Sequence, residues 1–277
     1  MRELCNRTWA VSNGGGDSGN SNGDGCSDEA KLIYVVDKNR RLSQFNPPTK
    51  TFTDLGTLGC SALVGATPFS MAIARDATAW VLYSSGELFR VETKNHLVCT
   101  KAAWAPNTQG LKVFGMGFST DQVGGTTDTL YISGGSDPGL STTSKLAKLD
   151  MTTFQPMNRG TVAGWPELTG TGSAELWGFF PQVQGSPLNA RIVRIDKTSG
   201  AAAQTYQATA LNDSGTPQAW AFAFHGGFFW AFLMKSNEGE TRVYQFDAST
   251  GAMIGVTDAD NRTIVGAGVS TCAPIIF

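Results

Sequence analysis

The chain has 277 residues, of which 41% are hydrophobic and 16% charged, with 33 glycines and a formal net charge of −2. The near-neutral charge argues against a nucleic-acid-binding protein, which needs a basic surface. No apolar run approaches the ~18 residues of a membrane-spanning helix. Low charge together with many glycines favours short strands joined by tight turns.

Residues 1–29 have low complexity, and we expect them to form a flexible tail. The run Ser12–Gly25 is mostly Gly, Ser, Asn and Asp, a composition that cannot bury a core. Gly16–Gly19 spells the nucleophile motif of serine proteases but lacks a neighbouring base. Ser18–Glu29 partly matches a calcium loop, with Ser in place of the first Asp and no flanking helices. Residues 1–13 lack the apolar stretch of a signal peptide.

From Leu32 onward, three kinds of segment recur in a fixed order. Runs of small residues come first, at Ser70–Ala74, Phe114–Phe118, Leu168–Gly172 and Trp220–Phe224. Aromatic or branched segments come second, at Ile33–Val36, Ala79–Tyr83, Leu130–Ile132, Leu176–Phe180 and Phe228–Phe232. Alternating segments that end in Asn, Glu or Asp come third, at Leu42–Asn46, Leu88–Glu92, Leu146–Asp150, Ile192–Asp196 and Val243–Asp247. The terminal acids suit the turns that follow, so we interpret them as turn caps and not as catalysts.

The first repeat lacks its run of small residues, and a surplus run, Val265–Thr271, follows the fifth repeat. The turn acids recur every 46 to 58 residues, which is a propeller spacing. We therefore predict an all-β, five-bladed β-propeller of four-stranded antiparallel blades, closed by the C-terminal strand. Six blades are the alternative if Trp9–Val11 begins another sheet. The predicted domain, 30–277, holds blades at 31–60 with 264–272, 68–104, 112–162, 166–209 and 217–258.

The small residues of the first strand in each blade have a physical explanation. Inner strands converge on the axis of a five-bladed ring, where a branched side chain would collide with its neighbours. Gly268 lies in the surplus run. Valine at this position should therefore destabilise the ring.

Five cysteines are too scattered for the paired spacing of a zinc site, so disulfides in an oxidising compartment are the better explanation. Cys60 and Cys99 follow the outer strands of adjacent blades and are predicted to form one bridge. Cys272 ends the closing strand and Cys26 precedes its partner strand, so a Cys26–Cys272 bond would lock the ring. Cys5 is left over.

Ligands of propellers usually meet the face that carries the loops leading into each inner strand, here called the loop face. Glu167 is the one carboxylate at the start of a predicted inner strand. The other candidates are Gln218 and Trp220 at the matching place in the fifth blade, and three residues of the tightest charged loop, Asp37, Arg40 and Arg41. The alternative interpretation is that these residues are solvated loop side chains.

The sequence gives little support for catalysis. A glycosidase needs two carboxylates, and only Glu167 is placed for one. The two histidines, His96 and His225, are predicted to lie apart, and no Ser or Cys stands beside a base. We predict no catalytic residue, no metal site and no cofactor.

Several segments resemble an uncharacterised group of bacterial exported propeller proteins, many of which are similar to cell-surface lipoproteins with a Gly/Ser/Asp tail. The segments are Pro68–Ala72, Ala79–Glu87, Phe114–Ser119, Glu167–Gly172, Trp220–Phe224 and Gly266–Pro274. The resemblance covers about Cys26 to Pro274. It implies the propeller fold and a secreted or cell-surface location, and no activity.

Three functions remain open from the sequence. The first is a non-catalytic extracytoplasmic scaffold that binds a protein or glycan through the loop face, with no nucleic acid and no membrane span. The second is a carbohydrate-active hydrolase or lyase that uses Glu167. The third is a lectin with one site per blade, but the loop sequences are not repeated between blades.

Overall fold

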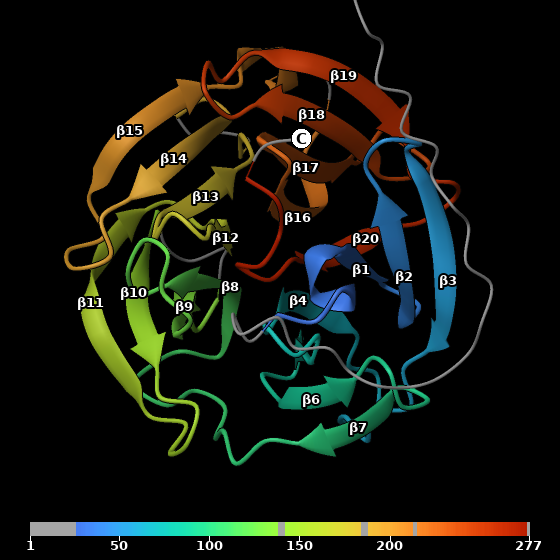
Figure 1. The fold of residues 1–277 in the computed structure, drawn as a ribbon, viewed down its shortest axis with the longest axis vertical. Helices are drawn as coiled ribbons and strands as arrows, with labels where there is room; N and C mark the ends of the chain where they lie inside the picture. Colours follow the sequence, from blue (N-terminus) through green and yellow to red (C-terminus); the bar gives the residue numbers. More distant parts are fainter. Residues whose placement is uncertain (1–25, 138–141, 184–187, 213–214, 276–277) are drawn as a thin grey trace, which may run out of the picture.

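Five four-stranded antiparallel sheets stand around a common axis, so the predicted five-bladed β-propeller is confirmed (Figure 1). The computed structural model describes residues 26–137, 142–183, 188–212 and 215–275. The alternative sixth blade at Trp9–Val11 and most of the predicted tail lie outside these residues. In the described part, no helix could span a membrane, since η1 (Glu29–Lys31) and η2 (Thr209–Leu211) have three residues each.

Each blade places one strand at the axis and three strands outward from it. From the inside outward, the blades are β20 (Ile264–Gly268), β1 (Ile33–Asp37), β2 (Arg41–Asn46) and β3 (Thr51–Thr57); β4 (Pro68–Ile73), β5 (Ala79–Tyr83), β6 (Leu88–Glu92) and β7 (Val98–Lys101); β8 (Val113–Thr120), β9 (Asp128–Gly135), β10 (Thr143–Leu149) and β11 (Pro156–Ala163); β12 (Glu167–Gly170), β13 (Leu176–Phe180), β14 (Arg191–Ile195) and β15 (Ala202–Gln207); β16 (Pro217–His225), β17 (Phe228–Lys235), β18 (Arg242–Asp247) and β19 (Met253–Asp258).

The last strand closes the ring by pairing with the first. Strand β20 is antiparallel to β1, with Gly268 opposite Tyr34 and Gly266 opposite Val36. A disulfide joins Cys26 to Cys272, as the sequence predicts, with the two Cα atoms 5.8 Å apart. Closure of the ring gives β1 a partner on both sides, and the inner edge of this blade is then β20, which packs beside the inner strands β4 and β16 of the neighbouring blades.

A second disulfide joins the outer parts of blades one and two. Cys60 follows β3, and Cys99 lies within β7 and not after it, with Cα atoms 5.0 Å apart. The sequence predicts this pairing as well. One bridge therefore fastens the closing strand, and the other links blade one to blade two.

Glycines of the inner strands allow neighbouring backbones to approach closely. A Cβ at Gly117 of β8 would lie 2.9 Å from the backbone of Leu168 and Thr169 in β12. A Cβ at Gly268 would lie 3.0 Å from the backbone nitrogen of Ile73 in β4. Such contacts are below van der Waals distance, so the small residues that mark the inner strands are a steric requirement of the ring.

Large side chains fill the wedges between blades farther from the axis. Phe45 of blade one packs edge-on against Trp230 and Phe232 of blade five, with ring centroids 5.2 and 5.7 Å apart. All three side chains are fully buried. Burial of this apolar area is the main favourable contribution to inter-blade association.

The acids that end the third strands cap the turns that follow. Oδ1 of Asp196 accepts hydrogen bonds from the backbone amides of Thr198 and Ser199, each at 2.9 Å. Asp247 makes the same pair of bonds in blade five, with Ser249 and Thr250. These bonds, together with the Thr198 hydroxyl, lower the pKa of Asp196 to about 2. Their role is structural, as the pattern predicts.

Candidate functional site

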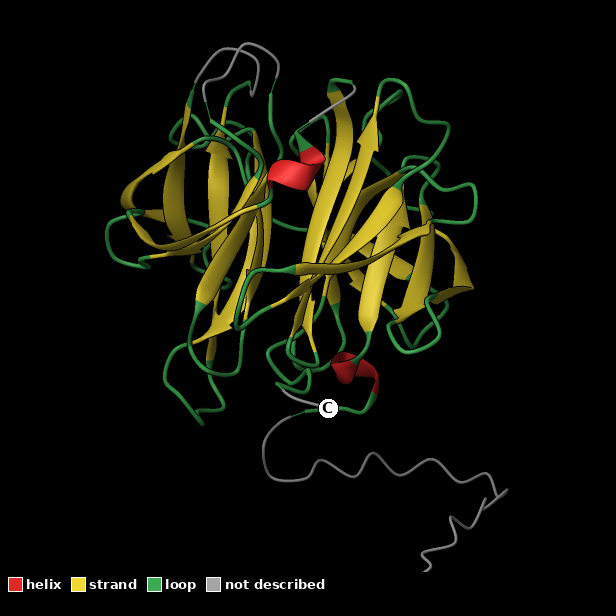
Figure 2. Ribbon diagram, turned by 90° about the horizontal axis from the view of Figure 1, so that it is seen from above, coloured by secondary structure: helices red, strands yellow, loops and turns green. Residues whose placement is uncertain are grey.

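The loop face holds the inter-blade loops and the hairpins between second and third strands. The opposite face, here called the turn face, holds the other hairpin turns and both ends of the described chain (Figure 2). On the turn face, the Ser270 hydroxyl donates to the Ala30 carbonyl at 2.8 Å. A ring nitrogen of His225 lies 3.0 Å from the carbonyl oxygen of Lys31. Segment η1 and the chain after β20 thus bind each other and the end of β16 on this face.

Glu167 begins the inner strand β12 on the loop face. Its Oε2 accepts a hydrogen bond of 2.8 Å from the hydroxyl of Ser70 in β4. Strands β4 and β12 belong to blades two and four, so the bond passes over β8 of blade three. Gly115 of β8 makes room for it, because a Cβ there would lie 2.9 Å from Cα of Glu167.

The environment of Glu167 disfavours the charged form of its carboxyl group. Its exposed fraction is 3%, and Ser70 is fully buried. Burial raises the pKa of Glu167 well above the ordinary 4.5, and the Ser70 hydrogen bond opposes this only in part. The pair therefore forms a buried hydrogen bond that joins the inner strands of two non-adjacent blades.

The charged loop of blade one forms a turn whose charges are satisfied internally. Asp37 is buried, and Oδ1 accepts hydrogen bonds from the amides of Asn39 and Arg41 at 2.9 and 2.8 Å. The Arg41 guanidinium lies 3.2 Å from Asp37 and 3.3 Å from Asp54. Arg40 is exposed between them, with φ of 69°. These contacts explain Asp37 and Arg41 without a ligand.

Gln218 and Trp220 are close in sequence but lie in different surroundings. Gln218 is exposed at a β-bulge, where the register of β16 against β17 shifts between Pro217 and Ala219. Trp220 is half-buried and packs against the core between blades four and five. The structure shows no hydrogen bond from Glu167 to either residue among the described side chains. The six candidates therefore do not form one polar cluster.

Sequence analysis missed a charged network on the turn face. Arg75 follows β4 and lies 3.1 Å from Asp128 at the start of β9. Asp128 also accepts a hydrogen bond of 2.7 Å from the hydroxyl of Thr271. Lys197 of blade four donates to the carbonyl of Thr120 at 3.0 Å. The network links blades two, three and four to the closing segment, and no shared motif marks it in the sequence.

A second missed residue, Arg262, joins blades five and one on the loop face. Its guanidinium lies 2.7 Å from Asp54 and 2.9 Å from Asp260. It also stands over the ring of Phe52, 4.8 Å from the centroid. The arginine lowers the pKa of Asp54 to about 2, with help from Ser43 and Arg41. This cluster supports the same blade boundary that the C-terminal strand closes.

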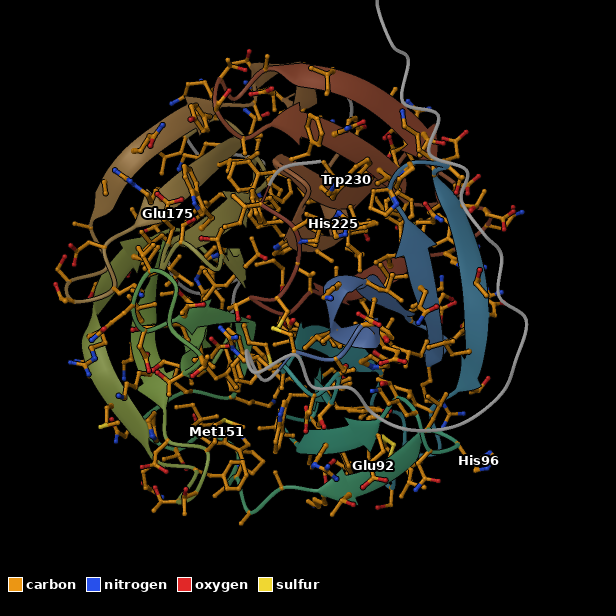
Figure 3. All side chains as sticks on the ribbon, in the orientation of Figure 1. Glu92, His96, Met151, Glu175, His225 and Trp230 are labelled. Carbon is orange, nitrogen blue, oxygen red and sulfur yellow. A yellow bond between two sulfur atoms is a disulfide. The ribbon has the colours of Figure 1, made fainter. Side chains whose placement is uncertain are left out.

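The described residues offer little for metal or acid–base chemistry. They contain no group of three or more His, Cys, Asp and Glu side chains that could hold a metal. His225 lies toward the centre of the ring and His96 at its rim (Figure 3). Two cavities, of about 290 and 180 Å³, lie between blades. Neither is lined by Glu167.

No protein-family profile matches the chain, and no curated protein matches it. Among solved structures, a protein of unknown function from Bacteroides caccae has 10% identity and a TM-score of 0.49, covering 86% of this chain and 97% of that one. A chain of the mitotic checkpoint complex has 13% identity and a TM-score of 0.42, covering 95% and 76%. The Dos1 propeller has 10% identity and a TM-score of 0.41, covering 82% and 56%. These similarities carry no argument about function.

Proposed function

We propose that the protein is a non-catalytic, extracytoplasmic scaffold that binds a protein partner through its loop face. The observation that supports this most is the pair formed by Glu167 and Ser70, in which both side chains are buried and joined by a hydrogen bond between two blades. Because Glu167 is inaccessible, the proposal assigns recognition to the exposed loops. On the turn face, η1 and the closing segment bind each other, so the proposal places the partner on the loop face.

The proposed location follows from the two disulfides. Bonds between Cys26 and Cys272 and between Cys60 and Cys99 indicate an oxidising environment. We further propose that the protein is secreted or attached to the cell surface. Two cross-links also suit a rigid binding platform, because rigidity lowers the entropy lost on binding.

The alternative, a hydrolase acting on saccharides, has less support. Its best feature is Glu167, because a raised pKa is what a general acid requires. A glycosidase needs a second carboxylate within about 5 to 10 Å. Burial raises the pKa of Glu167 against the opposing effect of the Ser70 hydrogen bond, and no other carboxylate contributes. A glycan partner, if any, would then bind to the surface without being cleaved.

The proposal is tested with a photo-cross-linking amino acid placed at Gln218 on the loop face and, as a matched control, at His96 on the turn face. Both side chains are exposed. The labelled proteins are irradiated with the extracellular proteins of the producing cells. We expect one discrete cross-linked species from position 218 and none from position 96. Equal labelling at both positions, or cleavage of glycans in a parallel assay, would overturn the proposal.

A further inference from the structure

The inter-blade loop 57–67 leads from β3 to β4 and contains no charged residue. Residues 63–66, here called the tip, form a β-turn in which the amide of Ala66 donates to the carbonyl of Leu63 at 2.9 Å. Gly65 takes the left-handed φ of 84° that this turn requires. The exposed fractions of Leu63 and Val64 are 68% and 99%. Two aliphatic side chains therefore project into solvent from one turn on the loop face.

The body of the protein holds the tip in place. The amide of Leu63 donates to Oε2 of Glu87 at 2.7 Å, and the ammonium of Lys101 lies 2.6 Å from Oε1 of the same carboxylate. Lys101, the Leu63 amide and the Ser85 hydroxyl lower the pKa of Glu87 to about 2. The Cys60–Cys99 disulfide fastens the start of the loop. A fixed apolar tip loses little conformational entropy when it binds.

Two cations flank the hairpin that anchors the tip. The carbonyl of Arg40 accepts a hydrogen bond of 2.8 Å from the amide of Leu58, at the start of the same loop. Burial raises the pKa of Tyr83 to about 12, and the nearby charge of Arg40 acts against this shift. A Cβ on Gly86 would lie 3.1 Å from Cγ of Lys112. Arg40 and Lys112 thus lie beside residues 84–87, which also contain Glu87.

Positive charge exceeds negative charge around the tip, although the whole chain has a formal net charge of −2. The segments 37–41, 84–87 and 101–112 hold five cations and two carboxylates, which are Lys38, Arg40, Arg41, Lys101, Lys112, Asp37 and Glu87. Arg41 pairs with Asp37, and Lys101 pairs with Glu87. The other three cations are exposed and form no ion pair among the described residues.

The turn face carries a turn of the same form in different electrostatic surroundings. An amide-to-carbonyl bond of 3.0 Å closes residues 122–125, and Gly124 has φ of 71°. Val123 stands where Val64 stands in the tip, and its exposed fraction is 76%. The nearest arginine, Arg75, pairs with Asp128. An exposed valine at this turn position therefore occurs twice, but only the tip has unpaired cations beside it among the described residues.

We propose that the tip binds the surface of a bilayer that contains anionic phospholipids. Leu63 and Val64 enter the boundary between headgroups and acyl chains, as the apolar faces of interfacial proteins do. Lys38, Arg40 and Lys112 stay at headgroup level, where each cation attracts the lipid phosphates. A protruding turn offers no groove to a peptide, whereas a fluid bilayer needs no complementary shape.

This inference concerns blades one and two and does not rest on the proposed function. The test of that function places its cross-linker at Gln218 in blade five. Contact of the tip with a bilayer would hold the protein at a membrane surface without a spanning segment.

The test mixes the intact protein with sedimenting vesicles of phosphatidylcholine, alone or in equal parts with phosphatidylglycerol. Half of the protein should bind the mixed vesicles at about 0.1 to 1 mM lipid, which is the strength of a marginal, reversible anchor. Binding to phosphatidylcholine alone should be about tenfold weaker or less, and added salt should weaken binding to the mixed vesicles. Failure to bind the mixed vesicles up to about 5 mM lipid would overturn the proposal and leave an acidic protein as the occupant.

Apolar variants locate the insertion. Val64→Ser should weaken binding about fivefold, because one aliphatic side chain no longer leaves water, and addition of Leu63→Ser should weaken it further. Val123→Ser makes the same change in the matching turn of the opposite face and should leave binding unchanged. The three side chains are exposed, so the variants should keep the wild-type melting temperature. Equal binding by the Val64 and Val123 variants would overturn the assignment.

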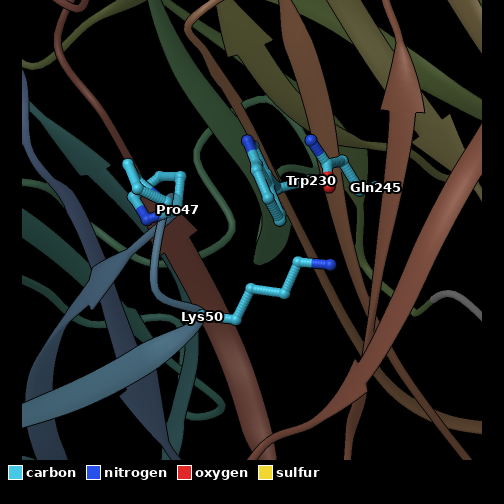
Figure 4. A pocket seen from close by; sticks show the side chains of 5 residues that line it. Pro47, Lys50, Trp230 and Gln245 are labelled. Atoms are coloured by element: carbon cyan, nitrogen blue, oxygen red, sulfur yellow. The ribbon is translucent and has the colours of Figure 1, made fainter.

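Charge variants locate the headgroup contact. Arg40→Gln together with Lys112→Gln should weaken binding to the mixed vesicles about tenfold and leave binding to phosphatidylcholine unchanged. Lys50→Gln together with Lys148→Gln is the control, because it removes the same charge elsewhere: Lys50 lies beside Trp230 in the turn after β2 (Figure 4), and Lys148 lies in β10. Equal losses in the two double variants would show attraction by net charge alone and would overturn the assignment.

Discussion

The buried acid on the axis makes the stability of the ring depend on pH. Burial holds the folded-state pKa of Glu167 well above 4.5, whereas the unfolded chain titrates near that ordinary value. Between the two values the folded protein holds one more proton than the unfolded chain. Stability is therefore highest below about pH 4.5 and falls as the pH rises, by about 1.4 kcal/mol for each pH unit, until the folded-state pKa is reached.

Glu167→Gln removes this titration and keeps the size and the hydrogen-bond acceptor of the side chain. Urea unfolding of both proteins between pH 4.5 and 7.5 should show the variant gaining on the wild type by about 1.4 kcal/mol per pH unit at first. Ser70→Ala is the control: it should cost about 1 kcal/mol and still lose stability as the pH rises, because the buried carboxyl group of Glu167 remains. Parallel stability curves for wild type and Glu167→Gln would refute the reasoning.

Three further predictions concern the inner-strand packing, one ion pair and the two disulfides. Gly117→Val should cost about 1 to 3 kcal/mol in urea unfolding, because its Cβ would lie 2.9 Å from the backbone of β12. Gly239→Val, with no atom within 4 Å of its Cβ, should cost less than about 0.5 kcal/mol; equal costs would contradict the crowding. Arg262 lowers the pKa of Asp54 from the ordinary 3.8 to about 2. The ionised Asp54 therefore stabilises the folded protein fully above pH 3.8, and this stabilisation is lost as the pH falls through about 2. Asp54→Asn should therefore be less stable than wild type at pH 6, and a gap that does not shrink toward pH 2 in chemical denaturation would count against the ion pair. Replacing Cys26 and Cys272 by serine opens a link that spans 246 residues, whereas replacing Cys60 and Cys99 opens one that spans 39. The chain-entropy costs are about 5 and about 4 kcal/mol, so the first double variant should lower the melting temperature more. The opposite order in calorimetry would contradict closure of the ring by the Cys26–Cys272 bond.

The ring itself could be predicted because its signals are local or repeated. Alternating apolar residues identify the strands, and acids such as Asp196 identify the turns that they cap. The glycines of β8 and β20 reflect contacts that every blade makes with its neighbour. The disulfides follow once the strands are ordered, because Cys26 and Cys272 flank paired strands.

The details of the candidate site could not be predicted in the same way. The bond between Ser70 and Glu167 joins non-adjacent blades, so no spacing in the sequence indicates it. The network of Arg75 and Asp128 also joins different blades, through residues outside the repeat.

The measurement that tests the central claim most directly is a thermal-shift screen of neutral oligosaccharides and divalent metal ions on the wild type and on Glu167→Gln. The claim is that Glu167 is a buried structural residue and that recognition takes place on the outer surface. It predicts that no ligand stabilises the wild type in a way that depends on Glu167. A ligand that raises the melting temperature of the wild type but not of Glu167→Gln would contradict the claim and favour the hydrolase.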